Sequence, residues 1–219
     1  MKKILLLLMF FVTLNLKAQN LQLHYDLNHK FVYSHIESFK SDKYGSSYFF
    51  VDMNYNENST HGVSMAYWEV SRALKFWKNP FALHFEYDGG FEQYQQSAYQ
   101  INDALLFGGE YTWNNVDFSK VFNLQVMYKT IRDKNTSFQI TGVWSIDFLK
   151  KLTFSGFLDF WRENNVYSTA NTKYTLLTKP QLWYNFTKQF SIGTEQGFSS
   201  NLTQRGINWS PEISTKWIF

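Results

Sequence analysis

Apolar and polar side chains alternate along most of the chain with a period of two. From Leu21 to Leu27 every second residue is apolar, and the residues between them are polar. The apolar side of nine such runs carries no charged residue, although 18% of the chain is charged. This pattern predicts β-strands that each present one apolar face. The nine runs occupy 21–27, 49–55, 81–87, 105–113, 122–128, 138–148, 152–160, 190–198 and 209–219.

Three weaker runs, at 32–40, 63–72 and 174–186, bring the expected number of strands to about twelve. An even antiparallel meander can close into a barrel, and it returns the C-terminus to the side of the N-terminus. We therefore predict an all-β fold, a closed antiparallel transmembrane meander β-barrel. Its outer loops are expected at 56–62, 90–100 and 163–173, and its periplasmic turns near 41–45, 114–120, 149–151 and 187–189.

Two prolines fall inside the predicted strands. Pro180 lies in one of the weaker runs and Pro211 in the last clear run. Proline has no backbone N–H, and a closed barrel has no free edge at which a missing donor is harmless. Each proline therefore predicts a bulge or a late strand start.

A soluble lipocalin-like barrel or β-sandwich would also alternate, with its apolar face pointing inward. Two features favour the membrane barrel. Aromatic residues lie near the ends of the predicted strands, as an interfacial girdle requires. The chain also stops on an aromatic residue within a strand, and Trp217 and Phe219 resemble the C-terminal signal that such barrels present to the barrel-assembly machinery.

The first residues have the features of a bacterial secretory signal. Lys2 and Lys3 precede the apolar segment 4–12, and Ala18 is a small residue suited to cleavage. We therefore expect a signal peptide at 1–18 and one barrel domain at 19–219, located in the outer membrane of a Gram-negative bacterium. Removal of the signal leaves equal numbers of basic and acidic residues, which argues against a nucleic acid polymer as partner.

Composition excludes several classes of protein. The chain has no cysteine, which excludes disulfides, thiol nucleophiles and cysteine-ligated metals. Aromatic residues make up 20% of the chain and there are only 3 prolines, which excludes intrinsic disorder. No Ser or His lies in a GxSxG or HExxH context, so the chain is not expected to be an enzyme or to need a cofactor.

The opposite, polar faces of the strands are expected to line the lumen. Acidic residues outnumber lysines there, which is compatible either with a solvated and mutually paired interior or with a pore that prefers neutral or cationic solutes. His84, Glu86 and Asp88 share one face of one strand, a spacing that could bind a divalent ion, but a lone strand rarely supplies a whole site, and no metal is predicted. The predicted charged lumen residues are Asp52, His84, Glu86, Asp88, Glu110, Lys129, Asp159 and Glu195, accompanied by His24, Asp26, Asp147, Glu212 and Lys216.

Aromatic residues also fall on these polar faces. They are Tyr48, Phe50, Phe157, Trp161 and Trp183. Two interpretations are open: the rings form a stacking path for a planar or ring-bearing solute, or they brace the lumen.

Several segments carry a resemblance to known proteins. The segments FFVDMNY, HFEYDGG, FSGFLDFWRE and GTEQGFSSN resemble an uncharacterised family of small outer-membrane barrels of Gram-negative gut bacteria. More remotely, the chain looks like the nucleoside-specific channel-forming proteins (Tsx), a resemblance that implies an aromatic-lined lumen and nucleoside transport.

Together these observations predict a monomeric barrel in outer-membrane lipid that passes small polar or ring-bearing solutes by passive and selective diffusion, with nucleosides as the candidate solutes. The alternatives are a non-transporting structural or surface-interaction barrel and a lipid-modifying barrel enzyme.

Overall fold

The computed structural model describes residues 19–57, 60–94, 97–167 and 170–219. The expected signal peptide, 1–18, lies outside the described residues. No helix in the described part of the chain is long and apolar enough to cross a membrane. The strands are β1 (Gln19–Asp26), β2 (Val32–Asp42), β3 (Gly45–Tyr55), β4 (Val63–Leu74), β5 (Phe81–Tyr94), β6 (Ser97–Asn114), β7 (Lys120–Ile131), β8 (Ser137–Phe148), β9 (Leu152–Val166), β10 (Asn171–Thr178), β11 (Gln181–Asn185), β12 (Phe190–Ser200) and β13 (Ile207–Ile218).

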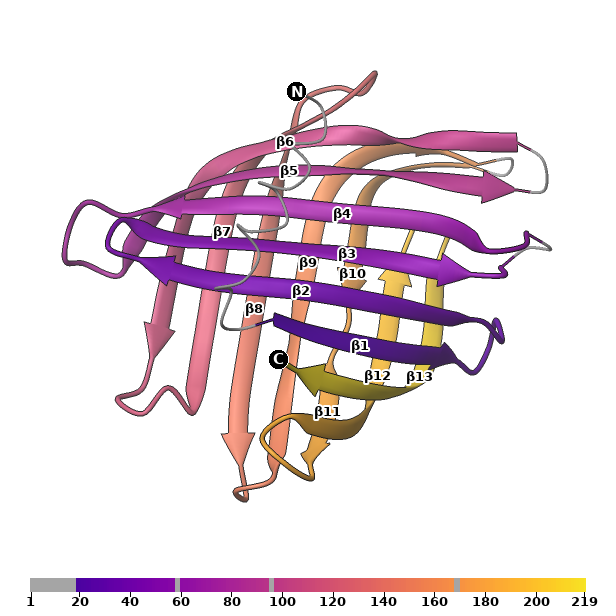
Figure 1. The fold of residues 1–219 in the computed structure, drawn as a ribbon. Coiled ribbons are helices and arrows are strands. Elements are labelled where there is room, and N and C mark those ends of the chain that lie inside the picture. The colour runs from indigo at the N-terminus through magenta and orange to yellow at the C-terminus, as the bar shows by residue number, and fades with distance from the viewer. Residues whose placement is uncertain (1–18, 58–59, 95–96, 168–169) are drawn as a thin grey trace, which may run out of the picture.

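Each strand pairs antiparallel with its neighbours in one sheet, and the sheet closes where β1 pairs with β13 (Figure 1). Both β10 and β11 pair with β9 on one side and β12 on the other. They are therefore two halves of one strand, and the barrel has twelve strands around its circumference, as predicted. The predicted closed all-β barrel is confirmed.

The two prolines are accommodated in different ways. Pro180 separates β10 from β11, and the chain there passes close to Gly156, where a Cβ atom would lie 2.6 Å from the Lys179 carbonyl oxygen. Pro211 stays within β13, but its carbonyl accepts from the N–H of Leu27, just beyond the end of β1. Because the N and the carbonyl of one residue face the same neighbouring strand, the missing N–H falls where β1 has already ended, and no ladder bond is lost.

The apolar faces of the alternating runs point outward. Leu23, Phe107 and Val126 are each about half exposed on the outer surface. Aromatic rings pack in pairs towards both ends of this surface, for example Trp113 with Phe122 and Phe198 with Trp209. The outside of the barrel is thus apolar with aromatic ends, which is the distribution that a lipid bilayer requires.

The predicted bounds of two outer loops are wrong. Most of 90–100 is strand, because β5 continues to Tyr94 and β6 begins at Ser97, and much of 163–173 belongs to β9 and β10. The sequence there alternates without a strong apolar face, because a hairpin that extends past the membrane needs backbone pairing but no lipid-facing side chains. The turns expected at 41–45, 114–120, 149–151 and 187–189 do connect strands, all at the end of the barrel that carries Gln19 and Ile218. We call this end the terminal end and the opposite one the loop end.

Candidate functional site in the barrel lumen

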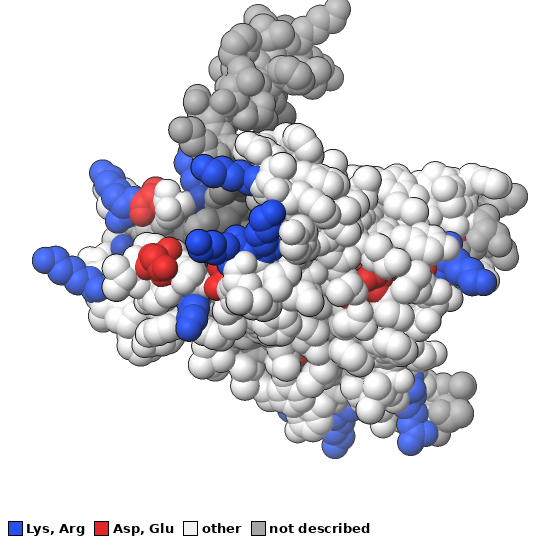
Figure 2. Space-filling model, turned by 90° about the horizontal axis from the view of Figure 1, so that it is seen from below, with Lys and Arg blue, Asp and Glu red and all other residues white. Residues whose placement is uncertain are grey.

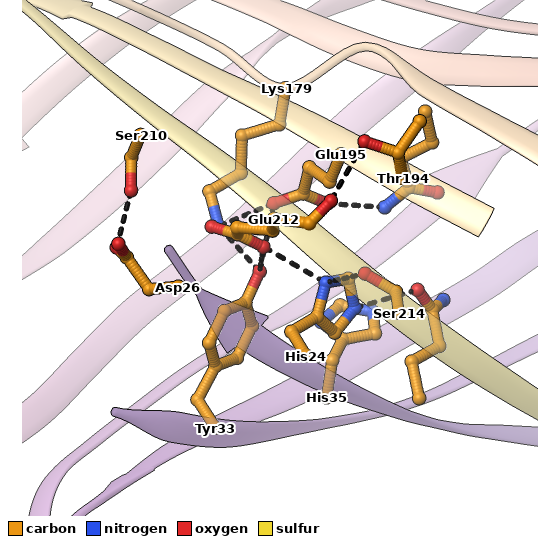
Figure 3. Close-up of polar contacts among 12 residues, drawn as sticks. His24, Asp26, Tyr33, His35, Lys179, Thr194, Glu195, Ser210, Glu212 and Ser214 are labelled. Carbon is orange, nitrogen blue, oxygen red and sulfur yellow. Dashed lines mark hydrogen bonds and ion pairs between the residues drawn. The ribbon is translucent and has the colours of Figure 1, made fainter. Parts of the chain in front are cut away.

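A cluster of charged and aromatic side chains lies on the inner wall where the barrel closes. We call His24, Tyr33, Lys179, Glu195 and Glu212 the seam cluster. They come from β1, β2, the β10–β11 junction, β12 and β13, and they point towards one another (Figure 3). The Lys179 ammonium lies 2.9 Å from a Glu195 oxygen and 3.2 Å from the Tyr33 hydroxyl. The cluster therefore links five neighbouring strand positions around the barrel wall.

Local sequence explains how Lys179 reaches this cluster. It precedes Pro180 at the break between β10 and β11, where its own N–H donates to the Phe157 carbonyl. Its ammonium also sits 4.9 Å from the centre of the Tyr33 ring. Lys179 thus places a positive charge beside the Glu195 carboxylate.

The seam cluster does not form a catalytic triad. Ser214 and Glu212 both contact the same nitrogen of His24, Nδ1, at 2.7 and 2.9 Å. The other nitrogen, Nε2, faces Gln22. A nucleophile–base–acid relay needs the serine and the acid on opposite ring nitrogens, so this arrangement serves packing rather than acyl transfer.

A second group of acids lies elsewhere on the inner wall, on β4 and β5. We call Glu69, Glu86 and Asp88 the carboxylate cluster, since they offer oxygens within 4.8 Å of one another. Asp88 is only 4% exposed, and one of its oxygens has no hydrogen-bond partner. The base nearest to Asp88 is Lys129, whose ammonium lies 3.7 Å from the other oxygen of this carboxylate.

The neighbours of the carboxylate cluster only partly offset its charge. Tyr67 donates to Glu69 at 2.8 Å, and His84 lies between Glu86 and Glu110 at 3.0 and 2.8 Å. Oxygen donors of this kind suit a hard cation, and Lys129 already supplies one positive charge beside them. The cluster is therefore crowded with acid, in contrast to the seam.

The inward tryptophans are packed rather than open. Trp183 is 0% exposed: its N–H donates to Gln181 and the Lys216 ammonium lies 4.2 Å above its ring. Gly193 leaves room for the other face of this ring, since a Cβ there would meet it at 2.5 Å. Trp161 is also buried, with its N–H donating to Glu163 and the Lys129 ammonium 4.9 Å from the ring centre.

The remaining predicted lumen residues lie on the inner wall with more open surroundings. Phe50 stacks on His35 with ring centres 5.1 Å apart, and Tyr48 donates to Glu37 at 2.8 Å. Asp52 accepts from His35 at 2.6 Å. Phe157, Asp159 and Glu110 face inward as well, and Asp159 accepts from Thr141 at 2.6 Å.

Sequence reasoning missed several inward groups. These groups lie on the two weaker runs, 32–40 and 63–72, for which the sequence analysis predicts no lumen residues. They are Tyr33, His35, Glu37 and Glu69. The same period of two would have found them, because they alternate with outward residues such as Ile36.

A cavity of about 190 Å³ opens beside the seam cluster towards the loop end. Its lining includes Asp26, Tyr33, Asp52, Lys179 and Glu212. The lumen therefore holds free space with acids, a lysine and an aromatic ring at its wall.

Comparison with known proteins shows which solved structures share the fold of this chain and to which family the chain belongs. The NanC porin matches with a TM-score of 0.62 and 12% identity, covering 92% of this chain and 100% of that one. The KdgM porin in complex with disordered oligogalacturonate matches with a TM-score of 0.52 and 13% identity, covering 92% and 98%. At such identities the similarity shows the fold alone: this chain has the barrel fold of these porins. No curated protein matches the chain. The family described as domain of unknown function DUF5020 matches residues 18–219, and the chain belongs to that family.

Proposed function

We propose that the protein is an outer-membrane channel through which small polar solutes diffuse passively, and that its lumen disfavours anions. The observation that carries the proposal is the contrast between the two surfaces of the wall. The outside is apolar with aromatic ends, whereas the inside is charged and encloses a cavity whose lining includes acids, a lysine and aromatic rings. Charged side chains beside free space offer a path to a hydrated solute, and twelve strands enclose a wider lumen than the eight that close on their own side chains.

The sign of the interior charge supports the anion barrier. On the inner wall of the described residues carboxylates outnumber lysines and histidines taken together, so that even fully protonated histidines leave an excess of acid. In a narrow lumen of low dielectric constant this excess repels anions more strongly than it would in bulk water. The carboxylates include Asp26, Glu37, Asp52, Glu69, Glu86, Asp88, Glu110, Asp147, Asp159, Glu195 and Glu212, and the bases include Lys129, Lys179, Lys216, His24, His35 and His84.

Within this proposal, nucleosides are the more specific solute class that we propose. They are uncharged and planar, and the partly open rings of Phe50 and Phe157 could stack on a base. The fully buried Trp183 fits the bracing interpretation better. The KdgM structure was obtained with an oligogalacturonate, an acidic sugar, and the acid excess here points to a different solute charge.

Swelling of proteoliposomes tests the proposal. Galactose and galacturonate differ by one carboxylate, and we expect galactose to enter faster. A nucleoside and a sugar of matched size form the second pair, in which faster nucleoside entry would support stacking. Phe50→Ala should then remove about 1 to 3 kcal/mol of solute interaction, roughly five- to 150-fold in affinity. Equal entry of galactose and galacturonate would contradict the anion barrier.

One observation favours a second function, a non-transporting barrel. The seam cluster and the two buried tryptophans pack the wall with satisfied contacts, which is how an interior is braced. A sealed liposome that admits neither sugar would support this alternative and overturn the channel.

A further inference from the structure

Lysines gather at the terminal end of the barrel. The five turns there, 43–44, 75–80, 115–119, 149–151 and 186–189, contain six lysines and a single acid, Asp117. Figure 2 shows Lys and Arg side chains, with fewer Asp and Glu side chains among them, around a hollow at one end of the molecule. We call these six the lysine crown: Lys43, Lys75, Lys78, Lys150, Lys151 and Lys188.

The crown is not neutralised by neighbouring acids. Among the described residues none of its members forms an ion pair, and two of them lie against aromatic rings instead: Lys43 on Tyr44 and Lys151 on Tyr184. At the loop end the bases are mixed with acids. Lys134 pairs with Glu163 at 3.2 Å, and Arg132 pairs with Asp103. Net positive charge is therefore concentrated at one mouth.

Along the barrel axis the crown follows the acid-rich lumen in series. Glu69 and Lys75 are six residues apart on one strand and its turn, which corresponds to about 20 Å along the strand and about 15 Å along the axis of a barrel whose strands tilt by about 40°. The Debye length is about 10 Å at 0.1 M salt. The two zones therefore do not cancel: each sets its own potential in the part of the path that it surrounds.

We infer that the lysine crown and the acid-rich lumen form a bipolar filter that favours uncharged solutes over ions of either sign. The inference rests on the proposed channel and refines its solute class. Acids in the lumen hold back anions, and lysines at the terminal mouth hold back cations. An uncharged polar solute meets neither barrier.

A bipolar path also conducts ions asymmetrically. Mobile cations collect in the acidic zone and mobile anions in the basic one. When the loop side is positive, both kinds of ion move towards the boundary between the zones and fill it, so the current is large. The opposite voltage empties that boundary and lowers the current.

Current–voltage curves of the whole mature protein in planar bilayers test the inference. We expect about two- to threefold rectification at 0.1 M KCl, because a potential of about one thermal unit changes local ion concentration about threefold. At 1 M, where the Debye length is about 3 Å, the curve should become nearly linear. The variant Lys43→Gln, Lys75→Gln, Lys150→Gln and Lys188→Gln should lose rectification and become more selective for cations in a salt gradient.

A matched control removes the same amount of charge from the other end. Lys30→Gln, Lys134→Gln, Lys173→Gln and Arg205→Gln should keep the rectification. A linear curve for the conducting parent protein at 0.1 M, or equal loss in both variants, would overturn the bipolar filter and leave the proposed channel standing. Absence of both conductance and solute entry would instead overturn the channel, and the filter with it. Heat-modifiable migration on detergent gels shows that each variant is folded.

Discussion

The seam cluster and the carboxylate cluster both gather acids on the inner wall but differ in how the charges of those acids are balanced. In the seam, Glu195 has Lys179 at 2.9 Å and the Tyr33 hydroxyl at 2.8 Å. In the carboxylate cluster, Asp88 has only Lys129 at 3.7 Å, and one of its oxygens has no partner. Each glutamate of the seam cluster thus has a base at 2.9 Å, whereas the base nearest to Asp88 lies at 3.7 Å.

We expect the two clusters to have different roles, one in stability and the other in ion selectivity. A buried network with satisfied partners fixes the geometry of the wall, and here it lies where β1 meets β13 and the barrel closes. Uncompensated carboxylates contribute little to the closure but create a field that acts on any ion in the lumen. Stability should therefore be sensitive at the seam, and ion selectivity at the carboxylate cluster.

The largest effect is expected from Lys179→Met. Without the ammonium, Glu195 and Glu212 remain buried next to each other, which should cost about 3 to 5 kcal/mol of unfolding free energy. Urea unfolding in lipid, followed by tryptophan fluorescence, measures it. Lys129→Met is the control at the other cluster, and an equal loss of stability there would remove the distinction between the two.

The comparison assumes that the inward and outward faces are placed correctly, and neighbouring positions on β9 test this. Leu158 faces outward and is 37% exposed, while Asp159 accepts from Thr141 inside. Leu158→Arg should cost about 2 to 4 kcal/mol in the bilayer, and Asp159→Asn should be mild. Similar tolerance of both changes would mean that the faces of β9 are reversed.

Tyr33→Phe should have an intermediate effect. It removes a hydroxyl that lies within hydrogen-bond distance of Glu195 and Glu212, a contact with charged groups worth about 1.5 to 3 kcal/mol. The same unfolding assay measures the change, and the temperature of heat modification should fall with it. A variant as stable as the parent would show that Lys179 alone holds the seam acids.

Asp88→Asn should have the smallest effect on stability, within about 0.5 kcal/mol of the parent or slightly stabilising, because it relieves repulsion among three close carboxylates. We expect Asp88→Asn to change ion selectivity instead: the reversal potential in a salt gradient should shift in the direction of greater anion permeability. A large loss of stability would show that Asp88 is as well matched as Glu195.

The sequence predicted the outside of the barrel far better than its inside. Outward residues such as Leu23 and Phe107 repeat with a strict period of two, because every strand meets the same solvent, lipid. The contact of Lys179 with Tyr33 joins residues 146 positions apart, and it depends on the register of the strands between them and on the closure of the barrel. Local periodicity carries no information on either.

The candidate site shows the same division. The period-two alternation of β5 placed His84, Glu86 and Asp88 on one inward face. It could not show that Glu69 from the neighbouring strand completes the carboxylate cluster. Nor could it show that Trp183 is enclosed, since that depends on Gly193 opposite and on Lys216 above the ring. Cross-strand neighbours decide which lumen residues are exposed.

The most direct test of an acid-rich lumen that selects solutes by charge is the ratio of galactose to galacturonate entry into proteoliposomes. It should be measured for the parent protein and for the variant Glu69→Gln, Glu86→Gln and Asp88→Asn. We expect a ratio well above one for the parent protein and a ratio close to one for the variant, with galactose entry unchanged. A ratio that stays the same after the three carboxylates are neutralised would contradict the account.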